Sequence, residues 1–437
     1  MLTQNALQVR ACGCRSAAGV NDLDKICVWA DFDFLREKEL IGTLFCGMVR
    51  GNAHFSFEYS PEWLVRHGSI TLGGDMRNGA GRQYPADGEE IFSFIRDTFP
   101  DRWGRLLLLC RMRLRAHDSS VSKMNAISFE TLLGTDEFSR MGGIIWRNEG
   151  SADRAGSQAQ CAVPSVKSLS ALCDASLSVE AAYEKNAQPS CEALDALALS
   201  ACSLGGARPK ASVIDTEGRL CVAKFPSVKD KEDNELLEHF AHLMARKAGI
   251  STAETSVIAV KRKRHVLLSR RFDRTSDGRR RHFASSMALL GLRDGDGTAT
   301  GKGYPDIADC IAAHCVNPEQ NLRELYRRIA FNILFGNTDD HFRNHGFLLT
   351  PDGWTLSPVY DLNPSHGRSQ RLLINDETDV SDIGALLDSS ERYLIERDEA
   401  AGIIREVKDA LHDWQKVATE NQIPLKIIDP YAHRFSC

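Results

Sequence analysis

The chain has 437 residues, of which 43% are apolar and 26% charged, and its formal net charge is -5. This composition is typical of a folded protein with two or three packed subdomains, and the charge gives no overall nucleic-acid signature. No apolar run reaches the roughly 18 residues of a membrane span, and the N-terminus lacks a secretory apolar core. We therefore expect a cytoplasmic protein without membrane contact.

The cysteines indicate reduced thiols. Thirteen of them are scattered between Cys12 and Cys437, and none forms a Cys-x-x-Cys pair. An odd, scattered set argues against both a disulfide framework and a zinc site.

The N-terminal third predicts a leader followed by a β-rich subdomain. Residues 1–20 are expected to be a disordered leader. Between residues 25 and 57, short apolar and aromatic runs broken by charge and glycine predict strands. Further on, apolar residues at helical spacing predict two helices on either side of Pro100, because proline interrupts a helix. We expect residues 21–147 to form one N-terminal subdomain.

A small polar stretch, residues 148–168, predicts a linker. Residues 169–283 then contain a Gly-rich turn, an apolar strand with Lys224 and an amphipathic helix that starts near Asp233. This order of elements is that of a protein-kinase small lobe. Residues 284–437 carry mostly helical spacing and predict a helical large lobe. The expected fold class is therefore α+β, of the protein-kinase type.

The most informative segment is NTDDHFRN, residues 337–344, which follows a buried apolar run. Polar side chains beside a core are costly unless they have partners or a function. Asp339 lies five positions before Asn344, which is the spacing of the catalytic Asp and the metal-binding Asn in protein kinases. We interpret Asp339 as the catalytic base and keep Asp340 as a secondary candidate. The alternative is a helix C-cap followed by a polar turn.

A second acidic residue completes a candidate metal site. Asp361 follows an apparent strand 17 positions after Asn344, close enough for a hairpin to bring the two together. Oxygen ligands from Asn344 and Asp361 suit Mg²⁺. His341 is interpreted as a structural hydrogen-bonding residue, since no Cys or second His stands at zinc-ligand spacing.

The Gly-rich turn and the strand lysine suit a nucleotide. Gly205 and Gly206 permit a tight turn whose N–H groups can face a phosphate, and Lys210 adds charge, although such a pair is often only a turn. Lys224 needs an anionic partner, because an unpaired ammonium in an apolar strand is costly. Glu235 is the candidate partner. Alternatively, Lys224 extends from a sheet edge to water and Glu235 only favours the helix N-terminus.

Taken together, these segments resemble the HipA family of serine/threonine kinases, the toxins of bacterial toxin–antitoxin modules. The resemblance covers nearly the whole chain after the leader. It rests on the strings PDRWGR, RMGG, SLGGARPKA, VAKFP, RRFDR, NTDDHFRNHGFLL and SPVYDLNP. It implies a kinase-like fold with a small β-rich subdomain in front, and it implies binding of ATP and Mg²⁺.

The resemblance also implies roles for individual residues. Lys224 would bind the ATP phosphates, Asp339 would be the catalytic base, and Asn344 with Asp361 would hold Mg²⁺. The backbone around Phe272 would match the hinge that contacts adenine. The full set of implied nucleotide-binding residues is Gly205, Gly206, Ala207, Lys210, Lys224, Arg271, Phe272, His341, Asn344 and Asp361.

Two positions beside the Gly-rich turn concern regulation. Ser203 matches a serine at which the family phosphorylates itself, and a phosphate there would add a charge of about -1.5 to -2 and pull the loop away from the nucleotide. The plain alternative is a turn hydroxyl. Arg208 and Pro209 stand where some family members have Gln-Glu. This departure leaves open how the loop moves.

Partners follow mainly from the resemblance. It implies a helix-turn-helix antitoxin like HipB, a dimer within the antitoxin complex, operator DNA reached through that complex, and an aminoacyl-tRNA synthetase as protein substrate. Residues 261–282 contain ten Lys or Arg and two Asp, an excess that could face phosphate or belong to a solvated hairpin. Two alternatives are a small-molecule kinase of the aminoglycoside type and a catalytically silent co-repressor. The intact Lys224, Asp339, Asn344 and Asp361 argue against the latter.

Overall fold

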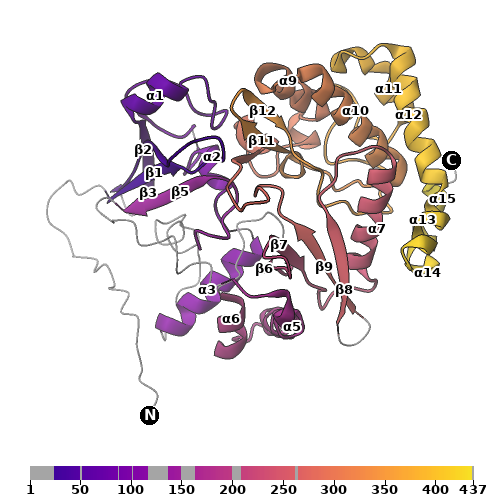
Figure 1. Ribbon diagram of the computed structural model, residues 1–437, viewed down its shortest axis with the longest axis horizontal. Helices are drawn as coiled ribbons and strands as arrows, with labels where there is room; N and C mark the ends of the chain where they lie inside the picture. Colours follow the sequence, from indigo (N-terminus) through magenta and orange to yellow (C-terminus); the bar gives the residue numbers. More distant parts are fainter. Residues whose placement is uncertain are drawn as a thin grey trace.

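A computed structural model describes residues 24–49, 52–86, 88–100, 102–116, 136–148, 163–198, 208–260 and 264–435. Three antiparallel sheets and a mainly helical C-terminal part make up the described fold (Figure 1). The α+β class expected from the sequence is confirmed. Several expectations fall outside the described residues, namely those for the leader, for most of the linker and for Ser203, Gly205, Gly206 and Ala207.

The first sheet contains the strands predicted between residues 25 and 57, and that prediction is confirmed. Its members are β1 (Asp24–Ala30), β2 (Glu39–Val49), β3 (Asn52–Tyr59), β4 (Arg82–Gln83) and β5 (Ile144–Asn148), in the order β4-β3-β2-β1-β5. Ile26, Val28 and Ala30 of β1 are buried at alternate positions, as in a strand with one face on a core. The helix α1 (Pro61–His67) follows β3, and the Ser60 hydroxyl caps it by accepting a hydrogen bond from the Trp63 N–H at 3.1 Å.

Two helices lie on either side of Pro100, as the sequence predicts, and they pack in different places. They are α2 (Ser93–Arg96) and α3 (Arg102–Ala116). Phe94 and Ile95 of α2 belong to the core cluster that includes the first sheet. Trp103 and Leu107 of α3 belong instead to a second cluster, formed with the next sheet. A helix from the expected N-terminal subdomain thus completes the core of the expected small lobe.

The second sheet is the one that carries Lys224. Its strands are β6 (Lys210–Ile214), β7 (Leu220–Lys224), β8 (Thr255–Val260) and β9 (Arg264–Arg270), in the order β6-β7-β9-β8. The short η2 (Val166–Ser168) leads into α5 (Leu169–Glu184), which with α6 (Cys191–Ala198) and α3 covers one side (Figure 1). The predicted amphipathic helix is α7 (Asn234–Lys247), capped by Asp233 through the Leu236 N–H at 3.3 Å.

The remaining chain forms a third, small sheet and a set of helices. The sheet has β10 (Phe283–Ser285), β11 (Gly346–Thr350) and β12 (Gly353–Leu356), and the longer helices are α9 (Tyr304–His314), α10 (Pro318–Phe335) and α12 (Arg397–His412). The shorter helical segments are α8 (Ser286–Leu289), η4 (Thr298–Thr300), η5 (Phe342–Asn344), α11 (Ile383–Asp388), η6 (Ser390–Tyr393), α13 (Trp414–Glu420), α14 (Leu425–Ile428), η7 (Asp429–Tyr431) and α15 (Ala432–Phe435).

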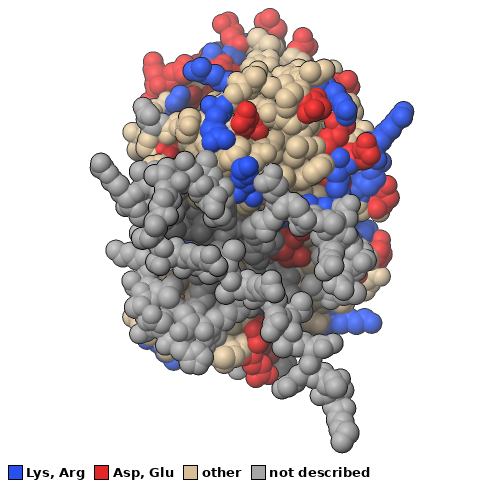
Figure 2. Space-filling view, turned by 90° about the vertical axis from the view of Figure 1, so that its left-hand side faces the viewer, with Lys and Arg blue, Asp and Glu red and all other residues tan. Residues whose placement is uncertain are grey.

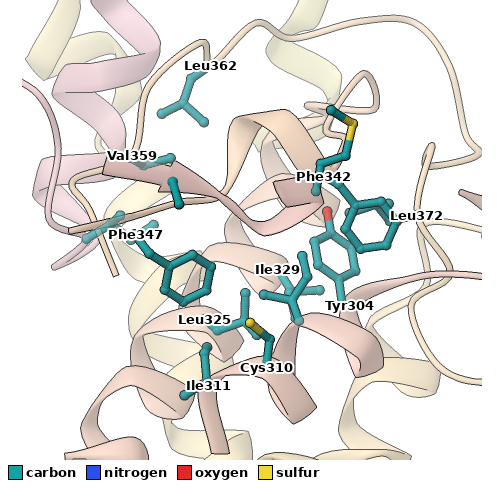
Figure 3. Close-up of a cluster of buried hydrophobic side chains, with 14 of the residues drawn as sticks. Tyr304, Cys310, Ile311, Leu325, Ile329, Phe342, Phe347, Val359, Leu362 and Leu372 are labelled. Carbon is teal, nitrogen blue, oxygen red and sulfur yellow. The ribbon is translucent and has the colours of Figure 1, made fainter. Parts of the chain in front are cut away.

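The core of this part supports the segment that the sequence singled out. Leu325 and Ile329, four residues apart on α10, lie near Phe347 of β11 and Phe342 of η5 in one apolar cluster (Figure 3). Helix α10 ends at Gly336, whose φ of +85° is the left-handed conformation that glycine adopts most readily. The polar segment 337–344 therefore starts at a sharp helix end and is held on packed apolar side chains.

The C-terminal segment Tyr431–Phe435 returns to the end of α10. The Phe435 ring lies 5.1 Å from the Phe335 ring and 6.3 Å from the Phe240 ring of α7. The Tyr431 hydroxyl donates a hydrogen bond to Glu232 at 3.2 Å. These contacts connect the last helix to α7 and to the start of the polar segment. Within the described residues, no helix combines the length and apolar character of a membrane span.

Candidate active site

One pocket brings together most of the predicted site residues that the structure describes. The predicted residues in its lining are Lys210, Lys224, Arg271, Phe272, His341, Asn344 and Asp361. These side chains come from the second sheet, from the 337–344 segment and from the loop after β12, which are far apart in the sequence. Asp339 and Glu235 are the exceptions among the described predicted residues, because neither lines the pocket.

Lys224 is the centre of a partly buried ion network, in which Glu238 is buried and the Asp361 side chain is 34% exposed. Its Nζ donates to Glu238 Oε1 at 2.6 Å and to Asp361 Oδ1 at 2.7 Å. Burial by itself would lower the pKa of Lys224, but the nearby Asp361 and Glu238 carboxylates outweigh burial and raise it. Burial likewise opposes ionisation of Asp361, and Lys224 and Lys210 outweigh burial, so its pKa is lowered. Lys224 and Asp361 are therefore both charged at neutral pH.

Lys224 pairs with Glu238 and not with the predicted partner Glu235, which lies one helical turn nearer the start of α7. Glu235 does not contact Lys224; its carboxylate accepts instead from Arg208 Nη2 at 2.8 Å. Lys224 Nζ donates to Glu238, which lies three residues further along α7. Both acids share one face of the helix, and only the position of α7 against the sheet decides which of them meets the lysine. The need for an anionic partner is confirmed, and its identity is corrected.

Asp361 and Asn344 fit a divalent cation by their chemistry. Both line the pocket, and Asn344 is buried at 6% exposure. Mg²⁺ needs only one or two protein oxygens, because water and phosphate oxygens fill its remaining positions. Within the described part of the chain, no group of three or more His, Cys, Asp or Glu side chains is arranged to hold a metal by itself. A two-residue Mg²⁺ site completed by a nucleotide is compatible with this arrangement.

The Asp361 backbone adopts an unusual conformation. Its φ of +60° lies in the left-handed region, which costs a non-glycine residue about 1 kcal/mol or more. The flanking side chains hold it there, since Leu362 is buried and the Tyr360 hydroxyl donates to the Arg343 carbonyl at 2.5 Å. Such strain at a pocket carboxylate indicates a functional position.

Asp339 and Asp340 have opposite environments. The Asp339 side chain is 71% exposed, and its carboxylate accepts a hydrogen bond from Arg371 Nε at 3.0 Å. The Asp340 carboxylate is buried and accepts from Tyr304 at 2.8 Å, Asn332 at 2.8 Å and His345 at 2.7 Å. Asp340 is thus fully used within the fold. Of the two, only Asp339 presents a carboxylate to an incoming molecule.

Arg271 and Phe272 of the RRFDR string both line the pocket, but their other contacts differ. The Arg271 guanidinium is buried and donates to Asp273 at 2.6 Å and to the Ser139 carbonyl at 2.9 Å, so this side chain joins two parts of the fold. Phe272 lines the pocket, with its ring 5.6 Å from the Tyr360 ring and 6.0 Å from the Phe283 ring. This aromatic end suits a flat heterocyclic base.

The basic stretch 261–282 does not form one cationic surface in its described part. Arg271 and Arg274 are buried on Asp273, and Arg270 pairs with the Glu254 carboxylate at 3.1 Å. Elsewhere on the molecule, the coloured part of the face in Figure 2 carries Lys and Arg side chains next to Asp and Glu side chains. These contacts favour a structural role for the described arginines of the stretch over a role in holding nucleic acid.

The sequence missed a group of pocket residues that precede PDRWGR. Arg96, Asp97 and Phe99 line the same pocket. Asp97 is partly buried and accepts from the Ser285 N–H at 2.6 Å and from its hydroxyl at 2.9 Å. Burial raises the pKa of Asp97, and the two Ser285 hydrogen bonds oppose the rise. Only a long-range contact places these residues here, and no local pattern signals it.

Comparison with known proteins agrees with this geometry. Residues 202–414 match the family model of the HipA-like C-terminal domain. The chain therefore contains a HipA-like C-terminal domain. The resemblance read from the sequence is thereby confirmed.

Two curated HipA-like relatives align with part of the chain. The serine/threonine-protein kinase toxin HipA of Shewanella oneidensis is 27% identical over 184 residues, which is 37% of this chain and 42% of that protein. A putative kinase of Haemophilus influenzae is 27% identical over 134 residues, or 28% of this chain and 39% of that protein. The chain thus spans less than half the length of the curated relatives it matches.

One solved structure matches over nearly the full HipA-like chain. It is the Shewanella oneidensis toxin–antitoxin system HipA, HipB and operator DNA complex, with a TM-score of 0.65, 17% identity, and coverage of 95% of this chain and 96% of that chain. At this identity the likeness shows the fold. The expected kinase-like fold is therefore confirmed.

Proposed function

We propose that this protein is an ATP- and Mg²⁺-dependent serine/threonine protein kinase. The observation that carries the proposal is the Lys224–Glu238–Asp361 ion network in a pocket that also contains Asn344. A lysine held by a helix glutamate, beside two oxygen ligands for a metal, is what phosphoryl transfer from a nucleotide requires of a protein. The match of residues 202–414 to the HipA-like C-terminal domain supports the same conclusion.

Each residue then has a chemical task. Lys224 presents its ammonium to the nucleotide phosphates, while Asn344 and Asp361 hold Mg²⁺. The bound metal would supply positive charge against the phosphate oxygens. Asp339 orients the acceptor hydroxyl and takes its proton as the hydroxyl oxygen bonds to the γ-phosphorus, while the bond from that phosphorus to the bridging oxygen breaks and ADP leaves. The aromatic end near Phe272 receives the base.

The exposure of Asp339 favours a protein substrate over a small molecule. Its carboxylate lies at the surface, 71% exposed, where a loop of another protein can bring a hydroxyl. A kinase for a small molecule instead needs an enclosed acceptor site around this carboxylate, because such ligands are mostly buried in their pockets. The aminoglycoside-type alternative is therefore disfavoured.

We further propose that the kinase is the toxin of a toxin–antitoxin pair in the cytoplasm. Support comes from the Shewanella oneidensis structure, in which HipA is in complex with HipB and operator DNA. By this analogy, a helix-turn-helix antitoxin neutralises the protein, and a dimeric complex of the two represses their operon on DNA. From the family resemblance we also infer that the protein phosphorylates itself at Ser203, which would regulate it. We infer in the same way that its protein substrate is an aminoacyl-tRNA synthetase.

The test compares wild type with Asp339→Ala in ATP-dependent phosphate transfer to itself and to bacterial proteins. Loss of the base is expected to lower the rate between about 10² and 10⁴-fold. A matched control is Asp309→Ala, because Asp309 also forms an exposed pair, with Arg392 at 2.6 Å, and lies outside the pocket lining. Equal rates for wild type and Asp339→Ala would contradict the assignment of the base. Growth of cells that express each variant tests toxicity separately.

A further inference from the structure

Arg208, the position at which the chain departs from some relatives, is bound to two acids. Its Nη1 and Nη2 donate to the two carboxylate oxygens of Asp230 at 2.9 and 2.6 Å, and Nη2 also donates to Glu235 at 2.8 Å. Asp230 is fixed in turn by the Ser227 N–H and by Asn234 Nδ2, both at 2.7 Å. A two-pronged contact of this kind defines the orientation of both groups.

One end of the β6–β7 hairpin is attached to α7 at two points, through Arg208 to Glu235 and through Lys224 to Glu238. Lys210 pairs in register with Lys224, so Arg208, just before β6, lies at the same end of the hairpin as Lys224. Glu235 and Glu238 are three residues apart and share one face of α7. The helix therefore receives Arg208 at Glu235 and Lys224 at Glu238, one turn apart.

The two carboxylates that bind Arg208 are buried, so loss of the arginine should disturb the fold around them. Glu235 is 3% exposed and the Asp230 side chain 8% exposed, whereas the Arg208 side chain is 38% exposed, so the two carboxylates are the buried members of this contact. Removal of one partner of a buried pair leaves an uncompensated charge, which is far more disruptive than loss of a surface pair. Burial raises the pKa of Glu235 to about 7, and Arg208 opposes this rise.

We propose that Arg208 is a positioning residue for phosphoryl transfer, which fixes α7 through Glu235 so that Glu238 stays on Lys224. The proposal rests on the proposed kinase function, and it adds a residue outside the pocket lining to the groups that control Lys224. Without Arg208, the first turn of α7 loses its attachment to the hairpin, and the Glu238–Lys224 contact is no longer held in one geometry.

The kinetic test uses Arg208→Ala, Arg208→Lys and the control Arg219→Ala. Arg219 lies on the same hairpin and pairs with Asp215 at 2.7 Å, at the opposite end from Lys224. Misplacement of a catalytic group by about 1 Å costs about a hundredfold in rate, so kcat of Arg208→Ala is expected to fall between about ten and a hundredfold. Arg208→Lys restores the charge without the two-pronged contact and should recover part of the rate. Arg219→Ala should match wild type.

A double-variant comparison decides whether Arg208 acts through Glu238. In a Glu238→Gln background, Arg208→Ala is expected to cause little further loss of kcat, since the contact that it maintains is already weakened. If Arg208→Ala lowers kcat by the same factor in both backgrounds, or leaves kcat unchanged in the wild-type background, the proposal is overturned.

A readout independent of catalysis separates this proposal from the kinase function. The rate at which acetic anhydride acetylates Lys224 Nζ, followed by mass spectrometry, reports how firmly its carboxylates hold the ammonium. Several-fold faster acetylation is expected in folded Arg208→Ala and Arg208→Lys, and no change in Arg219→Ala. Unchanged acetylation would overturn the positioning role even if the enzyme is active. Conversely, faster acetylation in a protein that transfers no phosphate would leave the positioning contact standing and remove the kinase function.

Discussion

Neighbouring residues of identical chemistry have separate tasks in this fold. Asp339 is exposed and pairs with Arg371, whereas Asp340 is buried under hydrogen bonds from Tyr304, Asn332 and His345. Burial alone would raise the pKa of Asp340, but His345 and Tyr304 outweigh burial and lower it, so the carboxylate stays charged. One aspartate supports the loop, and the other is available for chemistry.

This division gives a stability test at Asp340. Asp340→Ala leaves three buried donors without their acceptor and is expected to lower the free energy of unfolding by about 3–5 kcal/mol. Asp339→Ala removes only an exposed pair and should stay within about 0.5 kcal/mol of wild type. Urea denaturation followed by circular dichroism measures both. A similar loss for the two variants would contradict the buried network.

At the scale of elements, the first sheet and the C-terminal part meet at a histidine. His282, just before β10, stacks on Phe32 with ring centroids 4.9 Å apart and lies 5.5 Å from the Trp354 ring of β12. Among the described residues, neither ring nitrogen has a hydrogen-bond partner. Burial lowers the pKa of His282 to about 3, so the ring is neutral in the folded protein.

The lowered pKa makes this junction sensitive to acid. Below the ordinary histidine pKa of about 6.5 the unfolded chain takes up a proton that the folded chain does not, so stability falls as pH falls from about 6.5 towards 3. The contribution is about 1.4 kcal/mol per pH unit. Urea unfolding at pH 5 and pH 7 should show a smaller pH difference for His282→Phe than for wild type. If His282→Phe and wild type show the same change in unfolding free energy between pH 5 and pH 7, another titrating group causes that change.

At the scale of the whole molecule, α3 makes the N-terminal part and the second sheet depend on one another. Trp103 and Leu107 of α3 pack in the cluster that also contains Phe225 and Leu172. A shared core of this kind couples the unfolding of the parts that contribute to it. The protein should therefore unfold largely as one unit.

Trp103→Ala tests this coupling. Truncation of a buried aromatic side chain is expected to cost about 3–5 kcal/mol. The residue is only 3% exposed, while Val65 of α1 is 87% exposed, so Val65→Ala is the control that should leave stability unchanged. Calorimetry should show one transition at a lower temperature for Trp103→Ala. No change would contradict the shared core.

The sequence sufficed for features that depend on local pattern and chemistry. The strands of the first sheet, the helices around Pro100 and the meeting of Lys224, Asn344 and Asp361 in one pocket all agree with it. What it could not supply depends on distant packing. Lys224 pairs with Glu238 and not with the predicted Glu235, because the position of α7 against the sheet decides which turn of the helix meets the lysine. The Asp97 contact to Ser285 spans 188 residues and has no local signal.

The C-terminal segment Tyr431–Phe435 has a practical consequence for the limits of the HipA-like domain. The segment that matches the family model spans residues 202–414, yet Val417, Ile428 and Phe435 beyond its end are buried in the main core cluster. Before its start, α3 fills the second cluster. A fragment cut at 202 and 414 would expose both apolar surfaces to water and invite aggregation. The segment that matches the HipA-like domain is thus shorter than the segment whose side chains form these two cores.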